Sequence, residues 1–138
     1  MEYRVCRNNP APYNDLNGKI SLLGLGTMRL PLRDAADQTS IDEEKAQEIF
    51  DYAYAHGVNY FDTAYPYHGG MSEKFCGKAL AKYPRASYHL ASKLPGWLLK
   101  CDEDVPRIFN EQLANCRTDY FDFYLAHSVH ESLSLIHI

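Results

Sequence analysis

Residues 120–127 read Tyr-Phe-Asp-Phe-Tyr-Leu-Ala-His and are the clearest sign of the fold. The run is rich in aromatic residues and almost continuously apolar, which is typical of a strand buried on both faces of a parallel sheet. Parallel strands cannot be joined by tight turns and usually have a helix between them. The sequence upstream is therefore expected to alternate between strands and helices.

Three strand-like and three helix-like segments do alternate before this run. Together with the quoted stretch, the expected strands cover residues 20–25, 58–62, 88–93 and 120–127. The expected helices begin near Ser40, at Ser72 and among residues 102–104. Strands that alternate with helices at regular spacing are typical of βαβ units and a parallel sheet. Residues 8–18 form a turn-rich connection from a short N-terminal strand.

The first expected helix has a recognisable start and end. Ser40 is followed three residues later by Glu43, which is the capping-box pattern of a helix N-terminus. Gly57 supplies the residue type that commonly ends a helix in the left-handed conformation. Between them, one apolar stripe repeats at helical spacing and contains Ala46, Ile49, Phe50 and Ala53.

The strand spacing gives the size of the complete fold. The expected strands start about 34 residues apart, so eight units would need about 270 residues, close to the usual size of a TIM barrel. The chain has 138 residues. We therefore predict an α/β fold, a partial (β/α)8 barrel with about the first four strands and three helices, over residues 1–127. Residues 128–138 contain no helix start and no fifth strand, and we expect them to be a non-native or truncated tail.

Composition argues against several functional classes. The net charge is −4 and no basic stripe is present, so a nucleic-acid partner is not expected. No run of about 18 apolar residues could cross a membrane, and the first residues lack the apolar stretch of a secretory signal. The four cysteines form no Cys-x-x-Cys pair. We therefore expect no metal site and a cytoplasmic protein with reduced thiols.

Four residues with catalytic chemistry fall where the expected strands end. Asp62, Lys93 and His127 close three strands, and Tyr67 lies in the loop after Asp62. The carboxyl ends of barrel strands form one face, so these side chains are expected to converge there. A nearby ammonium group favours a tyrosine phenolate, a carboxylate can hold the ammonium in place, and a histidine can orient a carbonyl. The set could protonate a carbonyl while a hydride arrives from a separate donor.

Four segments of the sequence resemble the aldo/keto reductase family and lie in family order. They cover residues 23–31, 57–67, 91–94 and 118–127, and the most specific reads Gly-Val-Asn-Tyr-Phe-Asp-Thr-Ala-Tyr-Pro-Tyr at 57–67. The resemblance implies that Tyr67 is the general acid–base. It also implies that Lys93 and Asp62 tune that tyrosine and that His127 orients the substrate carbonyl.

The resemblance further implies a cofactor and a reaction. NADPH is the expected hydride donor, with Thr27 and Met28 near its nicotinamide and Asp62 near its ribose. The expected enzyme is an oxidoreductase that reduces small-molecule aldehydes or ketones to alcohols. In this family the cofactor phosphates are held mainly after the late strands, so we expect this chain alone to be an inactive fragment.

The segment after Asp62 and the segment from Lys93 to Trp97 resemble a branch of the family that often carries a C-terminal iron–sulfur region. Such a cluster would lie outside this chain. Trp97 is expected either to line a substrate pocket or to pack at the surface, and the sequence favours neither.

Two other functions stay open on the sequence alone. Some aldo/keto reductase relatives are regulatory subunits that sense the cofactor, and nothing here reveals the partner surface that such a subunit needs. A metal-dependent barrel hydrolase could use Asp62 and His127, but it typically needs several histidines at strand ends. His56, His68 and His89 fall instead at a helix end, in a loop and within a strand. The sequence identifies neither the substrate nor the oligomeric state.

Overall fold

The computed structural model describes residues 1–5 and 19–129. The connection expected at residues 8–18 and most of the tail expected at 128–138 lie outside the described residues. The elements, in chain order, are β1 (Tyr3–Val5), β2 (Lys19–Ser21), β3 (Leu25–Gly26), α1 (Glu43–Ala55), β4 (Tyr60–Asp62), η1 (Tyr67–Gly70), α2 (Met71–Leu80), η2 (Arg85–Ser87), β5 (His89–Leu94), η3 (Gly96–Leu98), α3 (Asp104–Asn115) and β6 (Phe123–Ala126).

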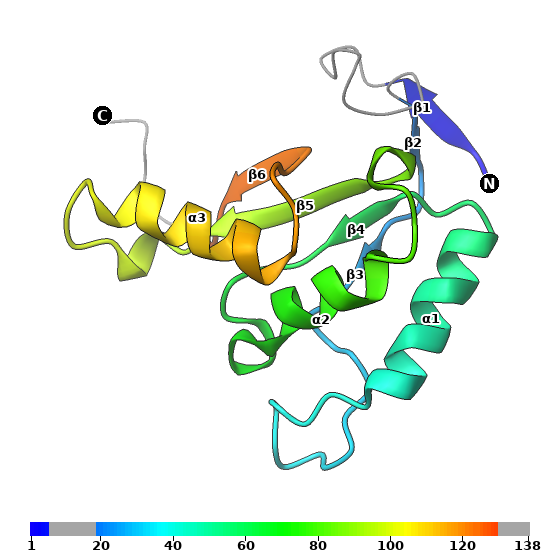
Figure 1. The fold of residues 1–138 in the computed structure, drawn as a ribbon, viewed down its shortest axis with the longest axis horizontal. Coiled ribbons are helices and arrows are strands. Elements are labelled where there is room, and N and C mark those ends of the chain that lie inside the picture. The colour runs from blue at the N-terminus through cyan, green and yellow to red at the C-terminus, as the bar shows by residue number, and fades with distance from the viewer. Residues whose placement is uncertain (6–18, 130–138) are drawn as a thin grey trace.

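A four-stranded parallel sheet with the order β3-β4-β5-β6 forms the centre of the described fold. In Figure 1 the helices α1, α2 and α3 lie along one side of this sheet, each following one strand in the chain. This confirms the expected α/β alternation and its four strands and three helices. No helix in the described part of the chain is long and apolar enough to cross a membrane.

Strand register brings the carboxyl ends of the strands together. Gly26 pairs with Asp62, and Asp62 pairs with Ala91 on β5. Two residues further along β5, Lys93 pairs with Leu125 of β6. Because all of these pairings are parallel, the residues that end each strand lie at the same edge of the sheet.

An aromatic cluster joins the sheet to the helices. Phe50 of α1 stacks on Phe61 of β4 with ring centroids 5.3 Å apart, and Phe75 of α2 meets Phe50 edge-on at 5.5 Å. All three rings are buried. A Cβ atom on Gly77 would lie 2.7 Å from the Asn115 carbonyl oxygen, so the missing side chain lets α2 approach the end of α3.

The strand expected at residues 20–25 is in fact two separate strands. β2 pairs in antiparallel register with β1, so the expected short N-terminal strand is present but forms its own two-stranded sheet. Only β3 joins the parallel sheet. Ser21 breaks the run because its amide donates to Asn59 Oδ1 at 2.8 Å and its hydroxyl accepts from the Asn59 amide at 3.1 Å. The apolar pattern of residues 20–25 could not predict these two hydrogen bonds between Ser21 and Asn59.

The start expected for the first helix is also wrong by a few residues. α1 is capped by Asp42, whose carboxylate accepts from the Lys45 amide at 3.3 Å. The Ser40 hydroxyl is engaged elsewhere, donating to the carbonyl oxygens of Asp34 and Asp37. The helix ends as expected before Gly57, whose φ is +86°.

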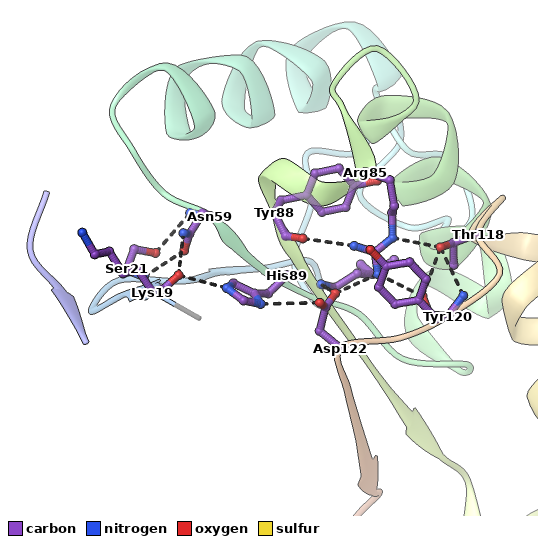
Figure 2. A network of polar contacts seen from close by, with 10 residues as sticks. Lys19, Ser21, Asn59, Arg85, Tyr88, His89, Thr118, Tyr120 and Asp122 are labelled. Atoms are coloured by element: carbon purple, nitrogen blue, oxygen red, sulfur yellow. Dashed lines mark hydrogen bonds and ion pairs between the residues drawn. The ribbon is translucent and has the colours of Figure 1, made fainter. Parts of the chain in front are cut away.

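A polar cluster ties the amino ends of the strands (Figure 2). Its His89 begins β5, whereas Lys93 lies near the other end of that strand. Asp122 Oδ2 accepts from Arg85 at 2.7 Å and from the Leu90 amide at 2.8 Å. The buried His89 ring lies between Asp122 and the Lys19 carbonyl oxygen, which is 3.0 Å from Nε2. In TIM barrels the face at the amino ends of the strands generally serves stability, whereas active sites lie at the carboxyl ends. This cluster links β2, β5 and the chain leading to β6.

Candidate active site

Lys93 lies at the centre of the candidate site, near the end of β5. Its Nζ donates to Asp62 Oδ1 at 2.5 Å and to the Thr63 carbonyl oxygen at 2.7 Å. The lysine side chain is 13% exposed. Because β4 and β5 are neighbours in parallel register, the end of one strand supplies the counter-charge for the end of the next.

The other two expected residues face this pair. Tyr67 opens the η1 turn after β4, and Lys93 Nζ lies 4.8 Å from the centroid of its ring. His127 follows β6 and meets the Tyr67 ring edge-on with centroids 5.7 Å apart. The structure therefore brings together all four residues that the sequence singled out, from three strand ends and one loop.

The His127 ring is partly shielded from solvent. Burial lowers its pKa below the ordinary value, and the Lys93 ammonium lowers the pKa further, against an opposing effect of Asp62. Its Nδ1 atom is buried and has no hydrogen-bond partner among the described residues. The indole ring of Trp97 packs on it with centroids 5.0 Å apart, and Trp97 is 46% exposed. Trp97 thus lies at the site and also at the surface.

The two residues expected near a nicotinamide differ in their surroundings. Thr27 is buried, and both its amide and its hydroxyl donate to the Asp62 carbonyl oxygen, at 2.9 and 3.0 Å. Met28, the next residue, is 58% exposed. Asp62 therefore contacts Lys93 through its side chain and Thr27 through its main chain.

Ser72 contributes to the site in a way that the sequence did not indicate. It was expected only as the first residue of a helix, whereas α2 begins one residue earlier. Its buried hydroxyl lies 2.8 Å from Thr27 Oγ1 and 3.0 Å from Thr63 Oγ1. Ser72 thus links the loop after β3 to the residue that follows Asp62.

A buried polar network behind β5 was also missed. Glu73 is fully buried, and its Oε1 accepts from Ser92 and from Gln112 Nε2, both at 2.6 Å. The same Gln112 amide group lies 3.1 Å from the Lys93 carbonyl oxygen, and its Oε1 accepts from the Tyr124 hydroxyl. One signal was available, because Gln112 falls at helical spacing on the otherwise apolar inner face of α3.

Metal-ligating side chains do not gather in the described residues: no three of the His, Cys, Asp and Glu residues in 1–5 and 19–129 are placed to share a metal ion.

Comparison with known proteins identifies the family. The sequence model of the aldo/keto reductase family matches residues 22–138. The chain belongs to the aldo/keto reductase family. It is 32% identical over 117 residues to the L-galactose dehydrogenase of Arabidopsis thaliana, covering 80% of this chain and 35% of that protein. It is 30% identical over 135 residues to the protein tas of Escherichia coli, covering 84% of this chain and 36% of the relative.

Solved aldo/keto reductases share the same fold. An aldo-keto reductase from Klebsiella pneumoniae, solved in complex with NADPH, superposes with a TM-score of 0.68 at 25% identity. The match covers 95% of this chain and 41% of that one. This confirms the expected partial barrel. The chain spans about a third of the length of the curated relatives named above.

Proposed function

We propose that the protein is an oxidoreductase that reduces aldehydes or ketones to alcohols with NADPH, as the aldo/keto reductase resemblance implies. One observation carries the proposal: the Lys93 ammonium lies against the Tyr67 ring while Asp62 and the Thr63 carbonyl hold it in place. A cation beside the ring can stabilise the negative charge that develops on the tyrosine oxygen as it gives its proton to a carbonyl.

The residues beside Asp62 fit the proposed cofactor. The Asp62 side chain is partly exposed, and Lys93 engages only its Oδ1 atom, which leaves an acceptor for a ribose hydroxyl. The Klebsiella pneumoniae relative binds NADPH, which supports the same cofactor here. When bound, NADPH would supply the hydride to the substrate carbon. Thr27, Met28 and Asp62 are the residues that we propose to hold its nicotinamide end.

In the proposed reaction this chain supplies the proton and orients the carbonyl. The Tyr67 hydroxyl donates its proton to the carbonyl oxygen as the hydride adds to the carbon, which gives the alcohol. Lys93 stabilises the phenolate left behind, and Asp62 keeps the lysine in position. The tyrosine then regains a proton before the next turnover.

The surroundings of His127 favour its neutral form with the proton on Nε2. Its pKa is lowered, so the uncharged ring predominates at neutral pH. Its buried Nδ1 has no partner among the described residues, and an unpaired buried N–H is rarer and costlier than an unpaired acceptor. A neutral Nε2–H is the donor needed to orient a carbonyl oxygen without competing for the proton of Tyr67.

Replacement of Tyr67 by Phe in the complete reading frame that encodes this chain tests the proposal. Loss of the proton donor is expected to lower kcat for a test aldehyde by roughly 10²- to 10⁴-fold, while NADPH fluorescence titration gives an unchanged Kd. Tyr65→Phe is the matched control, because the Tyr65 hydroxyl binds Glu111 of α3 instead of Lys93. Near-normal reduction by Tyr67→Phe would overturn the role of Tyr67. NADPH binding without reduction by the unmodified protein would instead favour the cofactor-sensing subunit.

A further inference from the structure

The turn that follows Tyr67 has an unusual backbone. His68, Gly69 and Gly70 have consecutive φ values of +53°, +61° and +87°. Glycine adopts this left-handed conformation freely, but a residue with a Cβ does so at a cost and keeps it only where its surroundings require it. His68 is therefore held in place by something other than its own conformational preference.

The contacts of the His68 ring supply that constraint. Its Nε2 lies 3.1 Å from the Leu30 amide, which can only donate, so this ring nitrogen is the acceptor. Its Nδ1 lies 2.9 Å from the Gln38 carbonyl oxygen, which can only accept, so this nitrogen carries the proton. Both His68 and Leu30 are buried. The two contacts fix one neutral tautomer and attach the ring to the segment between β3 and α1.

A second close approach lies at the next residue. A Cβ atom on Gly69 would lie 2.7 Å from Thr39 Cγ2, so the same segment packs directly on the turn. Within the segment, a bridge between Leu32 and Ile41 and the bond from the Arg33 amide to the Ser40 carbonyl close residues 30–41 into one lobe. The lobe is therefore attached to the Tyr67 turn through the two His68 contacts and the packing at Gly69.

We propose that His68 is a positioning residue that ties residues 30–41 to the turn that carries Tyr67. The inference rests on the proposed function, because it concerns the proposed proton donor and the proposed nicotinamide contact. Met28 lies between two anchors: Thr27 is bound to Asp62, and Leu30 is bound to His68. Tyr67 immediately precedes His68. The ring thus fixes the turn that carries the proton donor relative to the backbone that carries Met28.

Limited digestion with trypsin tests the tie without any assay of activity. Arg29 and Arg33 flank the contact of Leu30 with His68: Arg29 directly precedes residues 30–41, and Arg33 lies within them. The variants are made in the protein expressed from the complete reading frame. His68→Gly keeps a backbone suited to the turn but loses both ring contacts. Tryptic cleavage after Arg29 and Arg33 should therefore accelerate about tenfold or more. His68→Asn tolerates the same φ and can keep one contact, so its cleavage rate should lie between those of His68→Gly and the unmodified protein.

Leu80→Ala is the control for this digestion. It removes a buried side chain of α2 and lowers global stability, so it should raise cleavage at many lysines and arginines together. Selective cleavage after Arg29 and Arg33 in His68→Gly supports the tie. A His68→Gly digestion pattern and rate equal to those of the unmodified protein would overturn it, whether or not the protein is a reductase.

Kinetics then test the positioning role. With kcat expressed per NADPH-binding site, His68→Gly should lower kcat by roughly 10- to 100-fold, because small misplacements of reacting groups cost about that much. KM for the carbonyl substrate should change by less than kcat, and His68→Asn should recover part of the loss. A purely structural role would reduce the number of binding sites but leave kcat per site unchanged. That result would overturn the positioning role even if the digestion showed the tie.

Discussion

Lys93 places its ammonium group between a carboxylate and a tyrosine ring in a site where most of its side chain is shielded from water. A shielded charge that loses its partner is costly, because the attraction that offset its desolvation is gone. Asp62 and Lys93 are thus expected to behave as one unit.

A double-mutant cycle on the protein expressed from the complete reading frame measures the coupling between Asp62 and Lys93. Asp62→Asn leaves the lysine without its counter-charge, and Lys93→Met leaves the carboxylate without its cation. Each single change should lower kcat/KM strongly, and the double change should cost much less than the sum of the two losses in activation free energy. Losses that add in full would show that the two residues act independently.

The environment of His127 predicts a pH effect. Because its folded pKa is lowered, the ring should stay neutral down to a pH below the usual midpoint of about 6.5. The group contributes stability that is complete above that midpoint and declines as the pH falls through the folded pKa. An NMR titration of the His127 ring protons should therefore give a midpoint below the ordinary histidine value of about 6.5. A His127 midpoint at or above that value would contradict the proposed state of the ring.

At the scale of elements, sequence patterns located most helices and strands. Where a predicted boundary was wrong, side-chain hydrogen bonds that the patterns do not reveal were the cause. The Gly57 stop signal and the strand that ends at Asp62 depend on local chemistry and are predictable. The break of the strand at Ser21 depends on Asn59, 38 positions away. Asp42 caps α1 in place of the predicted Ser40, because the Ser40 hydroxyl bonds within its own loop.

The polar cluster at the amino ends of the strands carries a stability prediction. The pKa of Asp122 is lowered: burial, the largest single effect, raises it, but the contacts with His89, the Leu90 amide and Arg85 together outweigh burial. Asp122→Asn removes the charge and leaves Arg85 without its carboxylate partner, although Arg85 keeps its bonds to Thr118 and to two carbonyl oxygens. Unfolding by urea should show a loss of about 3 kcal/mol, near the lower end for a broken buried pair because Arg85 is partly exposed.

Acid should reproduce part of that loss. Because the folded pKa of Asp122 lies below the ordinary value of about 3.9, its contribution to stability is complete above that pH and declines as the pH falls below it.

Glu43→Gln is the control for Asp122→Asn. Glu43 and Lys78 form an exposed ion pair, and loss of this pair should cost less than about 1 kcal/mol. Equal effects of the two substitutions would show that the cluster does not stabilise the fold.

At the scale of the whole molecule, strand spacing predicted a partial barrel, and the convergence of the four candidate residues followed from it. Their tight contacts could not be predicted, because spacing gives the edge of the sheet at which residues meet and not the side chains that touch. The buried network of Glu73 and Gln112 shows the same limit, since its partners come from two helices and two strands.

We propose that residues 1–127 are the N-terminal half of a reductase barrel and predict that the 138-residue chain alone has poor solubility and little reductase activity. Within the described residues, β3 and β6 each pair on one side only, and unpaired strand edges favour association. The predicted phosphate-binding loops would also be lacking. Size-exclusion chromatography and NADPH fluorescence titration of this chain check both expectations. A soluble monomer with micromolar NADPH binding and turnover of a test aldehyde would contradict them.

Asp62 contacts two neighbours through two chemically different groups, and an amino-acid substitution can change only one of these groups. Its carboxylate belongs to the side chain and holds Lys93, whereas its carbonyl oxygen belongs to the main chain and receives both donors of Thr27. Every substitution that keeps the strand intact leaves the second set of bonds available. At position 62 the charge beside Lys93 can therefore be altered while the main-chain contacts that hold the Thr27 loop are kept.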